Sequence, residues 1–87
     1  MTYSVVWRPS AEAKLASIWN EADDRDAVAR AGDTIDSLLR TAPLTVGESR
    51  ADTSRILIVD TLAVYYDVHE DDQLVAVWAV WRPRSRN

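Results

Sequence analysis

The chain has 87 residues, of which 47% are hydrophobic, and it carries a formal net charge of −4 with no cysteine. These values fit one small domain spanning residues 1–87, exclude a disulfide framework or a thiolate metal site, and argue against a protein that coats nucleic acid with a basic surface. No apolar run approaches the roughly 20 residues that span a bilayer, and the start of the chain lacks a signal-peptide pattern, so we expect a cytoplasmic protein with no membrane segment.

The first predicted elements are a strand and a helix. Residues 3–7, YSVVW, alternate in the way that is typical of a strand rich in aromatic and β-branched side chains. Pro9 should end this strand, and Ser10 should cap the following helix by accepting a backbone hydrogen bond. The apolar face of that helix, over residues 11–22, consists of Ala11, Leu15, Ile18, Trp19 and Ala22.

A second helix is predicted from about Asp26 to Arg40. The cluster DDRD at 23–26 separates the two helices and supplies acidic residues that suit a helix N-terminus. The small residues Ala29 and Gly32 lie beside the apolar stripe of the second helix. We therefore expect an antiparallel helical hairpin whose helices approach closely there.

Three strands follow a loop over residues 41–54. The hydrophobic period changes to two and predicts strands over 55–60, 61–68 and 73–81. The last strand is apolar on both faces, so it should lie inside the sheet rather than at an edge. The order β-α-α-β-β-β predicts an α+β fold, a two-layer sandwich with the helical hairpin on one face of the sheet.

The four tryptophans divide between the core and the surface. Core packing explains Trp7 and Trp19 most simply. Trp78 and Trp81 are three residues apart in one strand, so regular alternation sends them to opposite faces. One of the two should then face outward on the helix-free side of the sheet, where it would serve in partner binding.

The order of these elements resembles one protein family. The segments YSVVWRPSAEAKLASIW, AVARAGDTIDSLL, GESR, RILIV, LAVYYDV and VAVWAVWR together resemble the RelE/ParE superfamily of type II toxins, which includes plasmid stabilisation proteins. The resemblance covers about residues 3–84. It implies an antiparallel sheet in which the first strand lies beside the last.

The resemblance implies two alternative activities. RelE-like members are ribosome-dependent endoribonucleases that cut mRNA without a metal, whereas ParE-like members act on DNA gyrase. By similarity with the nucleases, Arg55 and either Arg82 or Arg84 would stabilise phosphate charge, with Arg50 a weaker candidate. Since Pro83 ends the last strand, we expect Arg82 and Arg84 to lie beside Arg55 at one end of the sheet.

The acid and base that such a nuclease needs are not evident. The loop GESRADTS stands where RelE-like enzymes have a lysine pair, and the residues after Arg82 lack the aromatic residue or histidine those enzymes use. The remaining candidates are His69, Tyr65, Glu48 and Asp52. His69 also fits an ordinary turn residue, and Arg50 and Arg55 also fit surface ion pairs.

Partners follow from the same resemblance, and no cofactor is expected. A cognate antitoxin would cover the open sheet face, and its carboxylates would pair with Arg55, Arg82 and Arg84. The candidate targets are mRNA on the ribosome and DNA gyrase, and a degenerate homologue would bind only the antitoxin. Asp71 and Asp72 fit a solvated turn rather than a metal site. The sequence leaves the oligomeric state open.

Overall fold

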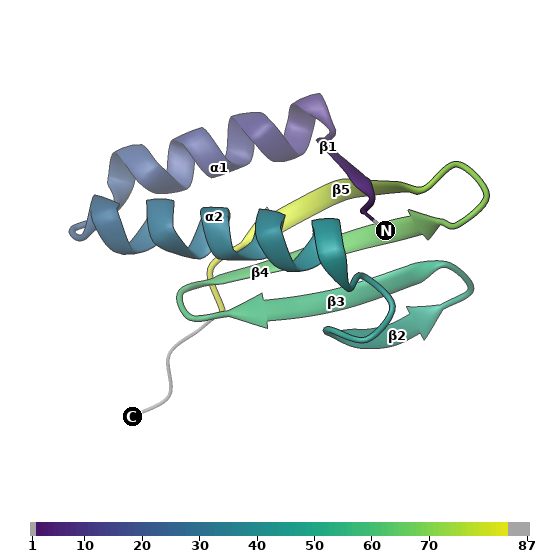
Figure 1. Cartoon of the computed structure of the whole chain (residues 1–87). Helices are drawn as coiled ribbons and strands as arrows, with labels where there is room; N and C mark the ends of the chain where they lie inside the picture. Colours follow the sequence, from purple (N-terminus) through teal and green to yellow (C-terminus); the bar gives the residue numbers. More distant parts are fainter. Residues whose placement is uncertain (1, 84–87) are drawn as a thin grey trace.

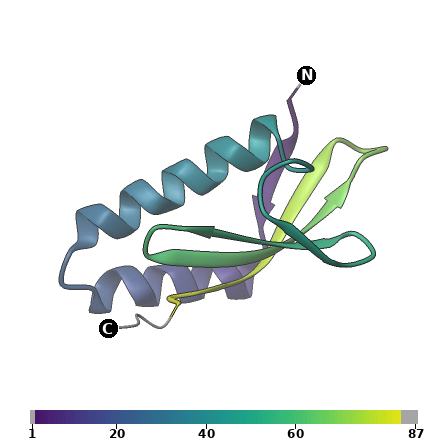
Figure 2. The same ribbon diagram turned by 90° about the horizontal axis from the view of Figure 1, so that it is seen from below.

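The computed structural model describes residues 2–83, which form two helices and five strands (Figure 1). Along the chain these are β1 (Ser4–Trp7), α1 (Pro9–Glu21), α2 (Arg25–Thr41), β2 (Glu48–Ala51), β3 (Ser54–Val59), β4 (Leu62–His69) and β5 (Leu74–Trp81). Both helices lie on the same face of the sheet (Figures 1 and 2). The predicted two-layer α+β sandwich is confirmed.

The strands form one mixed sheet in the order β1-β5-β4-β3-β2. The first strand lies beside the last, as expected, and the last strand is interior. Two details differ from expectation: β2 forms within the predicted loop, and β1 runs parallel to β5.

The two helices begin in different ways. Pro9 occupies the first turn of α1, where its missing N–H is not needed, and Arg8 at the N-cap makes no side-chain hydrogen bond. The predicted cap at Ser10 is therefore wrong. α2 starts as the acidic cluster indicated, because the carboxylate of Asp24 accepts a hydrogen bond of 3.0 Å from the N–H of Ala27.

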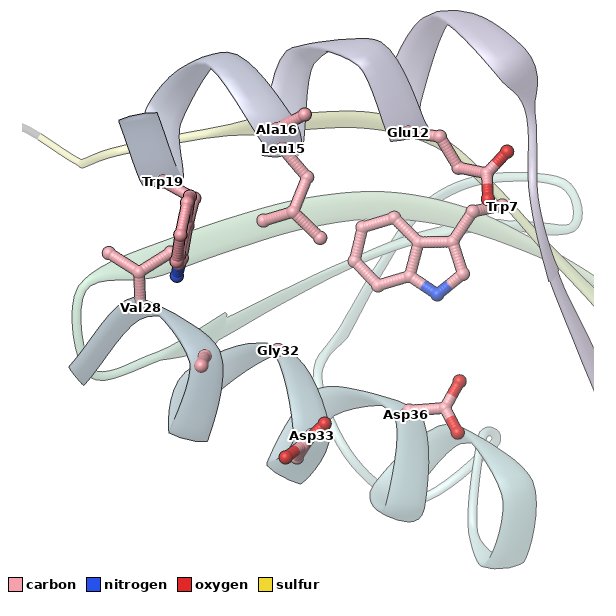
Figure 3. Close-up of a pocket in the computed structure, with 10 residues that line it drawn as sticks. Trp7, Glu12, Leu15, Ala16, Trp19, Val28, Gly32, Asp33 and Asp36 are labelled. Carbon is pink, nitrogen blue, oxygen red and sulfur yellow. The ribbon is translucent and has the colours of Figure 1, made fainter. Parts of the chain in front are cut away.

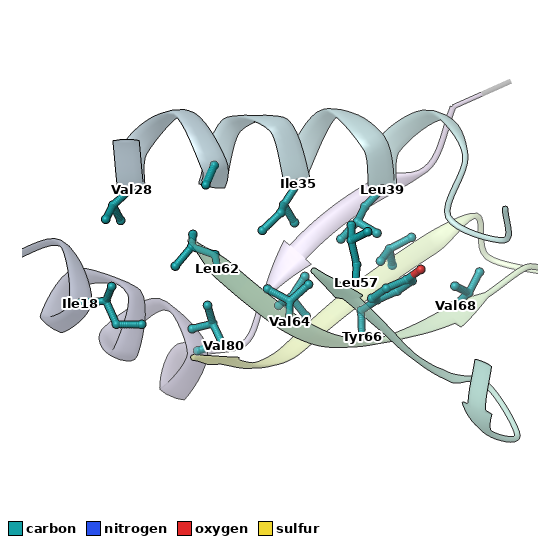
Figure 4. Packing of buried hydrophobic residues seen from close by; sticks show 14 of the residues in the cluster. Ile18, Val28, Ile35, Leu39, Leu57, Leu62, Val64, Tyr66, Val68 and Val80 are labelled. Atoms are coloured by element: carbon teal, nitrogen blue, oxygen red, sulfur yellow. The ribbon is translucent and has the colours of Figure 1, made fainter. Parts of the chain in front are cut away.

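The main core lies between the helical layer and the sheet (Figure 4). Its members are the inward-facing residues of α2, β4 and β5 together with one side of α1. Those with no exposed surface are Ile35, Leu39, Leu62, Val64, Tyr66, Val75 and Val77. The core therefore uses only one apolar stripe of each helix and one face of the sheet. The other face of the sheet is not covered by a helix.

The helical hairpin is present, but its helices do not need a small residue at Gly32. A Cβ atom at Gly32 would have Leu15 Cδ2 as its nearest neighbour, at 4.0 Å, which is ordinary van der Waals distance. The expected close approach at this position is therefore wrong. An open groove separates α1 from α2 instead.

A β-bulge in β5 changes which side chains face the helices. Tyr66 of β4 pairs with Val77, but the preceding Tyr65 pairs with Ala79, so Trp78 is an extra residue without a partner in β4. Regular alternation therefore stops at this point. Trp78 and Trp81 both point away from the helices, which corrects the expectation that they lie on opposite faces.

Candidate functional site

Three aromatic side chains stack on the face of the sheet that the helices leave uncovered. The ring centroid of Tyr65 is 5.0 Å from that of Trp78, with 9° between the planes, and 4.9 Å from that of Trp81, with 39° between the planes. Separations of about 4.5–7 Å are typical of favourable aromatic pairs. We call Tyr65, Trp78 and Trp81 the aromatic trio, and the surface that carries it the helix-free face.

The aromatic trio covers a small apolar cluster that is separate from the main core. Ile56 pairs with Tyr65 across β3 and β4, and Ala63 pairs with Trp81 across β4 and β5. Ile56 and Ala63 are 8% and 0% exposed although no helix covers them. The trio thus does the shielding that a third layer would otherwise provide.

Other apolar side chains on this face remain in contact with solvent. Ile58 is 59% exposed, Val6 is 46% exposed and Trp78 of the trio is 38% exposed. They come from three strands, β3, β1 and β5. An exposed apolar surface with a large aromatic anchor is typical of a protein-binding site.

Arg55 points to the other side of the sheet, beneath the loop that joins α2 to β2. Its guanidinium Nη2 donates to the carbonyl oxygens of Val46 at 3.5 Å and Gly47 at 3.3 Å. Arg55 is half-buried and pairs across the strands with Tyr66, which belongs to the main core. These contacts give Arg55 a structural task, which is to hold the loop against the sheet.

Tyr66 holds the same loop from the neighbouring strand. Its hydroxyl lies 2.9 Å from the carbonyl oxygens of both Pro43 and Val46, so its single proton serves one of them at a time or is shared. Burial raises the pKa of the Tyr66 hydroxyl above its ordinary value of 10.0, although the nearby Arg55 acts in the opposite direction. The hydroxyl is therefore a neutral donor at physiological pH.

The arginines expected to meet at one end of the sheet lie apart. Arg82 follows Trp81, which pairs with Ala63, whereas Arg55 pairs with Tyr66, three residues further along the same strand. The separation along the strands is about 13 Å at the usual rise per residue, and Arg55 faces the helices. The expected meeting of Arg55 with Arg82 is wrong, and Arg84 lies outside the described residues.

Several solved structures of toxin–antitoxin systems have a similar arrangement of elements. The RelBE2 toxin–antitoxin complex of Mycobacterium tuberculosis matches at a TM-score of 0.81 and 16% identity, covering 98% of this chain and 95% of that one. A chain of the chromosomal ParDE system of Pseudomonas aeruginosa matches at a TM-score of 0.71 and 16% identity, covering 94% and 97%. The isolated Escherichia coli RelE toxin matches at a TM-score of 0.69 and 11% identity, covering 97% and 87%.

This chain has the RelE/ParE toxin fold. At 11–17% identity the likeness concerns the fold and does not distinguish the activities of RelE and ParE. No protein-family model matches the sequence, and no curated protein matches it significantly.

Within this RelE/ParE fold, the acid–base candidates do not converge. His69 is exposed at the end of β4, four residues from Tyr65. Glu48 lies on the edge strand β2, two strands away from Tyr65, and its carboxylate is 3.8 Å from the guanidinium of Arg50. Proton transfer requires groups within hydrogen-bond reach of one reacting atom. Among residues 2–83, no hydrogen bond joins any two of His69, Tyr65 and Glu48.

Two further properties of the RelE/ParE-fold domain bear on its chemistry. In the described part of the chain, no group of three or more His, Asp or Glu residues is placed to hold a metal ion. Neither helix between residues 2 and 83 has the length and apolar character needed to cross a bilayer.

The sequence indicates the two tryptophans but not the central ring of the candidate site. The sequence indicates Tyr65 only as an acid or base, whereas it is the ring on which both tryptophans pack. The available signal was the presence of apolar residues on both faces of residues 73–81. The bulge at Trp78 leaves no mark in the alternation, so the shared face of the three rings was not predictable from the sequence.

Proposed function

We propose that this protein is the toxin of a type II toxin–antitoxin pair, and that it acts by binding its target rather than by cutting RNA. Its fold is that of RelE and ParE toxins, and similar structures include complexes of a toxin with its antitoxin. The observation that carries the proposal is the aromatic trio on the helix-free face. A cognate antitoxin would cover that face and keep the target away from it.

The chemistry of the helix-free face favours binding. The described face offers three stacked rings and two exposed aliphatic side chains, Ile58 and Val6. A nuclease of this kind needs positive charge on the phosphate together with an acid and a base within reach of the reacting atoms. Arg55 faces the other layer and binds backbone carbonyls, so it does not supply that charge here.

Ribosome-dependent cleavage of mRNA is the second candidate, and one observation favours it. Arg82 is exposed and directly follows Trp81 of the aromatic trio. Aromatic rings that stack on bases, combined with an arginine that contacts phosphate, are common in single-strand binding sites. Arg84 and Arg50 are further residues that would contact phosphate in this second function. In the first function, the target would be a protein such as DNA gyrase.

The two candidates are separated by inducing the gene alone in a bacterial host. Binding of a protein target such as gyrase predicts growth arrest with a DNA-damage response and no new mRNA ends. Translation-dependent 5′ ends within coding regions would instead establish the nuclease. Normal growth at a verified level of folded protein would contradict both toxin activities.

The role of the helix-free face is tested by a pair of matched variants. Trp78→Ala should abolish growth arrest and weaken antitoxin binding, because Trp78 is the most exposed ring of the aromatic trio. Trp19→Ala removes the same side chain from α1 in the other layer and should leave growth arrest intact. Circular dichroism of both purified variants verifies that the fold is kept. Equal arrest by Trp78→Ala and the parent chain would refute the assignment.

A further inference from the structure

One acidic side chain lies beside the aromatic trio on the helix-free face. Asp67 is the only acidic residue in the three central strands of the sheet, β3, β4 and β5. It follows Tyr65 by two positions along β4, so alternation places both side chains on the same face. The helix-free face therefore carries a negative charge next to its three rings.

The carboxylate of Asp67 is held in place by the neighbouring strand. Ser54 of β3 pairs with Asp67, and its hydroxyl donates to Oδ1 of the carboxylate at 2.6 Å. A distance of about 2.5–2.7 Å is typical of a hydroxyl bound to an ionised carboxylate. Asp67 is partly buried and forms no ion pair with any cation of residues 2–83. Because a carboxylate accepts up to about four hydrogen bonds, most of its capacity remains for a partner.

The register of β4 and β5 places Asp67 at one end of the aromatic trio. Tyr65 pairs with Ala79, which lies between the two tryptophans of the trio along β5, so the tyrosine ring separates their rings. Asp67 pairs with Ala76, two residues before Trp78. Trp78 is therefore the ring of the stack that lies nearest to Asp67.

The ring of Trp78 has one free face on the side of Asp67. Its other face is covered by Tyr65, whose centroid is 5.0 Å away, yet Trp78 is 38% exposed. Diagonal neighbours on one face of a sheet are about 7–8 Å apart, which is within the reach of long side chains. Ala76, opposite Asp67, is too small to separate the two. A single incoming side chain can therefore touch the Trp78 ring and the Asp67 carboxylate together.

The chain already contains a guanidinium on an indole ring, in the opposite layer. Trp19 lines the open groove between α1 and α2 (Figure 3). The guanidinium of Arg25 lies 4.7 Å from the centroid of that ring and donates to the carbonyl oxygens of Trp19 at 3.2 Å and Asn20 at 3.0 Å. The cation thus combines a ring face with acceptors beside it. Trp78 has an acceptor beside it in Asp67, but no cation of the described residues lies over its ring.

We propose that Asp67 and Trp78 form a subsite for one arginine side chain of the protein that binds the helix-free face. The guanidinium would stack on the free face of Trp78 and donate to the carboxylate of Asp67. Arginine fits better than lysine, because its planar group stacks on aromatic rings and donates two parallel hydrogen bonds to a carboxylate. The proposal rests on the proposed function and adds the chemistry of one contact with the partner.

The charge of this arginine subsite also bears on the class of partner. A nucleic-acid strand that stacked its bases on the aromatic trio would bring phosphates close to Asp67. The carboxylate would repel them, since no cation of residues 2–83 is paired with it. A basic side chain of a protein is attracted instead. The subsite therefore favours a protein over mRNA as the ligand at this end of the trio.

The test compares N-acetyl-arginine amide with N-acetyl-citrulline amide as probes of the full chain. Citrulline has the same length and a planar end group but no charge. Two-dimensional NMR of the isotope-labelled protein follows the indole N–H of Trp78 during each titration. We expect the arginine probe to bind about fivefold more tightly at low ionic strength, with the ratio falling as salt screens the charges. Equal affinities, or no shift of the Trp78 signal with either probe, would overturn the proposal.

Matched variants separate the arginine subsite from general attraction to an acidic protein. Asp67→Asn keeps the shape and an oxygen acceptor for Ser54, and it should remove the preference for arginine over citrulline. Asp60→Asn removes the same charge from the exposed β3–β4 turn, where asparagine tolerates the φ angle of 54°, and should leave the preference unchanged within about twofold. The NMR spectra verify that both variants are folded. A preference that survives Asp67→Asn, or that falls equally in Asp60→Asn, would refute the subsite.

The outcome for the proposed function is read separately. Growth arrest by a chain that does not distinguish arginine from citrulline would support the toxin function and contradict the subsite. Arginine-selective binding at Trp78 in a chain that causes no arrest would do the reverse. A shift of the same signal by oligouridine RNA, equal in the parent and in Asp67→Asn, would identify a nucleic-acid strand as the occupant and overturn the proposal.

Discussion

At the scale of single residues, the loop between α2 and β2 depends on a few polar contacts to β3 and β4. Tyr66 and Arg55 bind its carbonyl oxygens, and Gly47 allows its backbone to approach Ile56. Deprived of these partners, the buried carbonyls would be left without hydrogen bonds, which costs about 1–3 kcal/mol for each group. We therefore expect this loop to be sensitive to small changes.

The two glycines of the chain should respond in opposite ways to substitution by alanine. Gly47 has a φ angle of +70°, and a Cβ there would overlap the carbonyl oxygen of Ile56 and lie 3.0 Å from the Tyr66 hydroxyl. Gly47→Ala should lower the free energy of unfolding by at least about 2 kcal/mol. Gly32→Ala should raise it by about 0.5–1 kcal/mol. Urea denaturation measures both, and a stabilised Gly47→Ala variant would contradict the strained position.

Tyr66→Phe should lower the free energy of unfolding by about 1–3 kcal/mol at neutral pH, because it removes the hydroxyl and keeps the ring. This difference should depend on pH. The pKa of Tyr66 is raised in the folded chain, so above about pH 10 the unfolded chain releases the proton while the folded chain retains it. The contribution of the Tyr66 hydroxyl to the free energy of unfolding is thus fully present below about pH 10 and decreases as the pH rises above it.

Urea midpoints measured for the parent chain and Tyr66→Phe at neutral pH and at about pH 11 test the linkage. The two midpoints should approach each other at the higher pH. A gap that stays constant or widens would show that the Tyr66 proton is not held more tightly in the folded state.

At the scale of elements, the sheet was easier to predict than the pairing within it. Residues 55–60, 61–68 and 73–81 were assigned from their period of two, and the strands lie within one or two residues of those ranges. The strand β2 was missed because its sequence, ESRA, is polar and all four residues are exposed. An edge strand made by backbone pairing alone carries no hydrophobic pattern from which it could be recognised.

Because of the bulge in β5, the chain should tolerate the deletion of Trp78. Without Trp78, the pairs Tyr66 with Val77 and Tyr65 with Ala79 would follow one another in regular alternation. A chain lacking Trp78 should therefore fold, with one ring of the aromatic trio missing. A chain lacking Ala76 should not fold, because Val75 would then turn away from the core. Circular dichroism and thermal unfolding distinguish the two, and a folded chain without Ala76 would contradict the register.

At the scale of the whole molecule, the described residues expose apolar side chains on both layers. The aromatic trio lies on the sheet side, and the open groove between α1 and α2 lies on the helical side. The fold class followed from element order and hydrophobic period. The candidate site could not be predicted in this way. It depends on which strands pair and on the extra residue Trp78 in the bulge of β5, and neither is visible in the local sequence. Arg55 shows this most clearly, since its place near the start of a strand was predicted but the contacts of its guanidinium with the loop before β2 were not.

A ligand that binds only the folded chain must raise its stability. At an antitoxin concentration of about 100 Kd, the gain should be about 2.7 kcal/mol. Thermal unfolding with increasing amounts of the purified antitoxin measures this shift. Trp78→Ala should reduce it, because it removes the most exposed ring of the aromatic trio. An unchanged unfolding temperature at saturating antitoxin would show that the folded domain is not what the antitoxin recognises.

The parallel pairing of β1 with β5 has a consequence for the time at which the domain becomes complete. Ser4 pairs with Leu74, so the first strand finds its neighbour only after seventy further residues have been synthesised. At about 5–20 residues per second, this delay is roughly 4–14 s on the ribosome. The tryptophans of the aromatic trio belong to that same late strand. A nascent chain therefore acquires its last structural neighbour and its exposed aromatic surface at the same moment, and shorter nascent chains have neither.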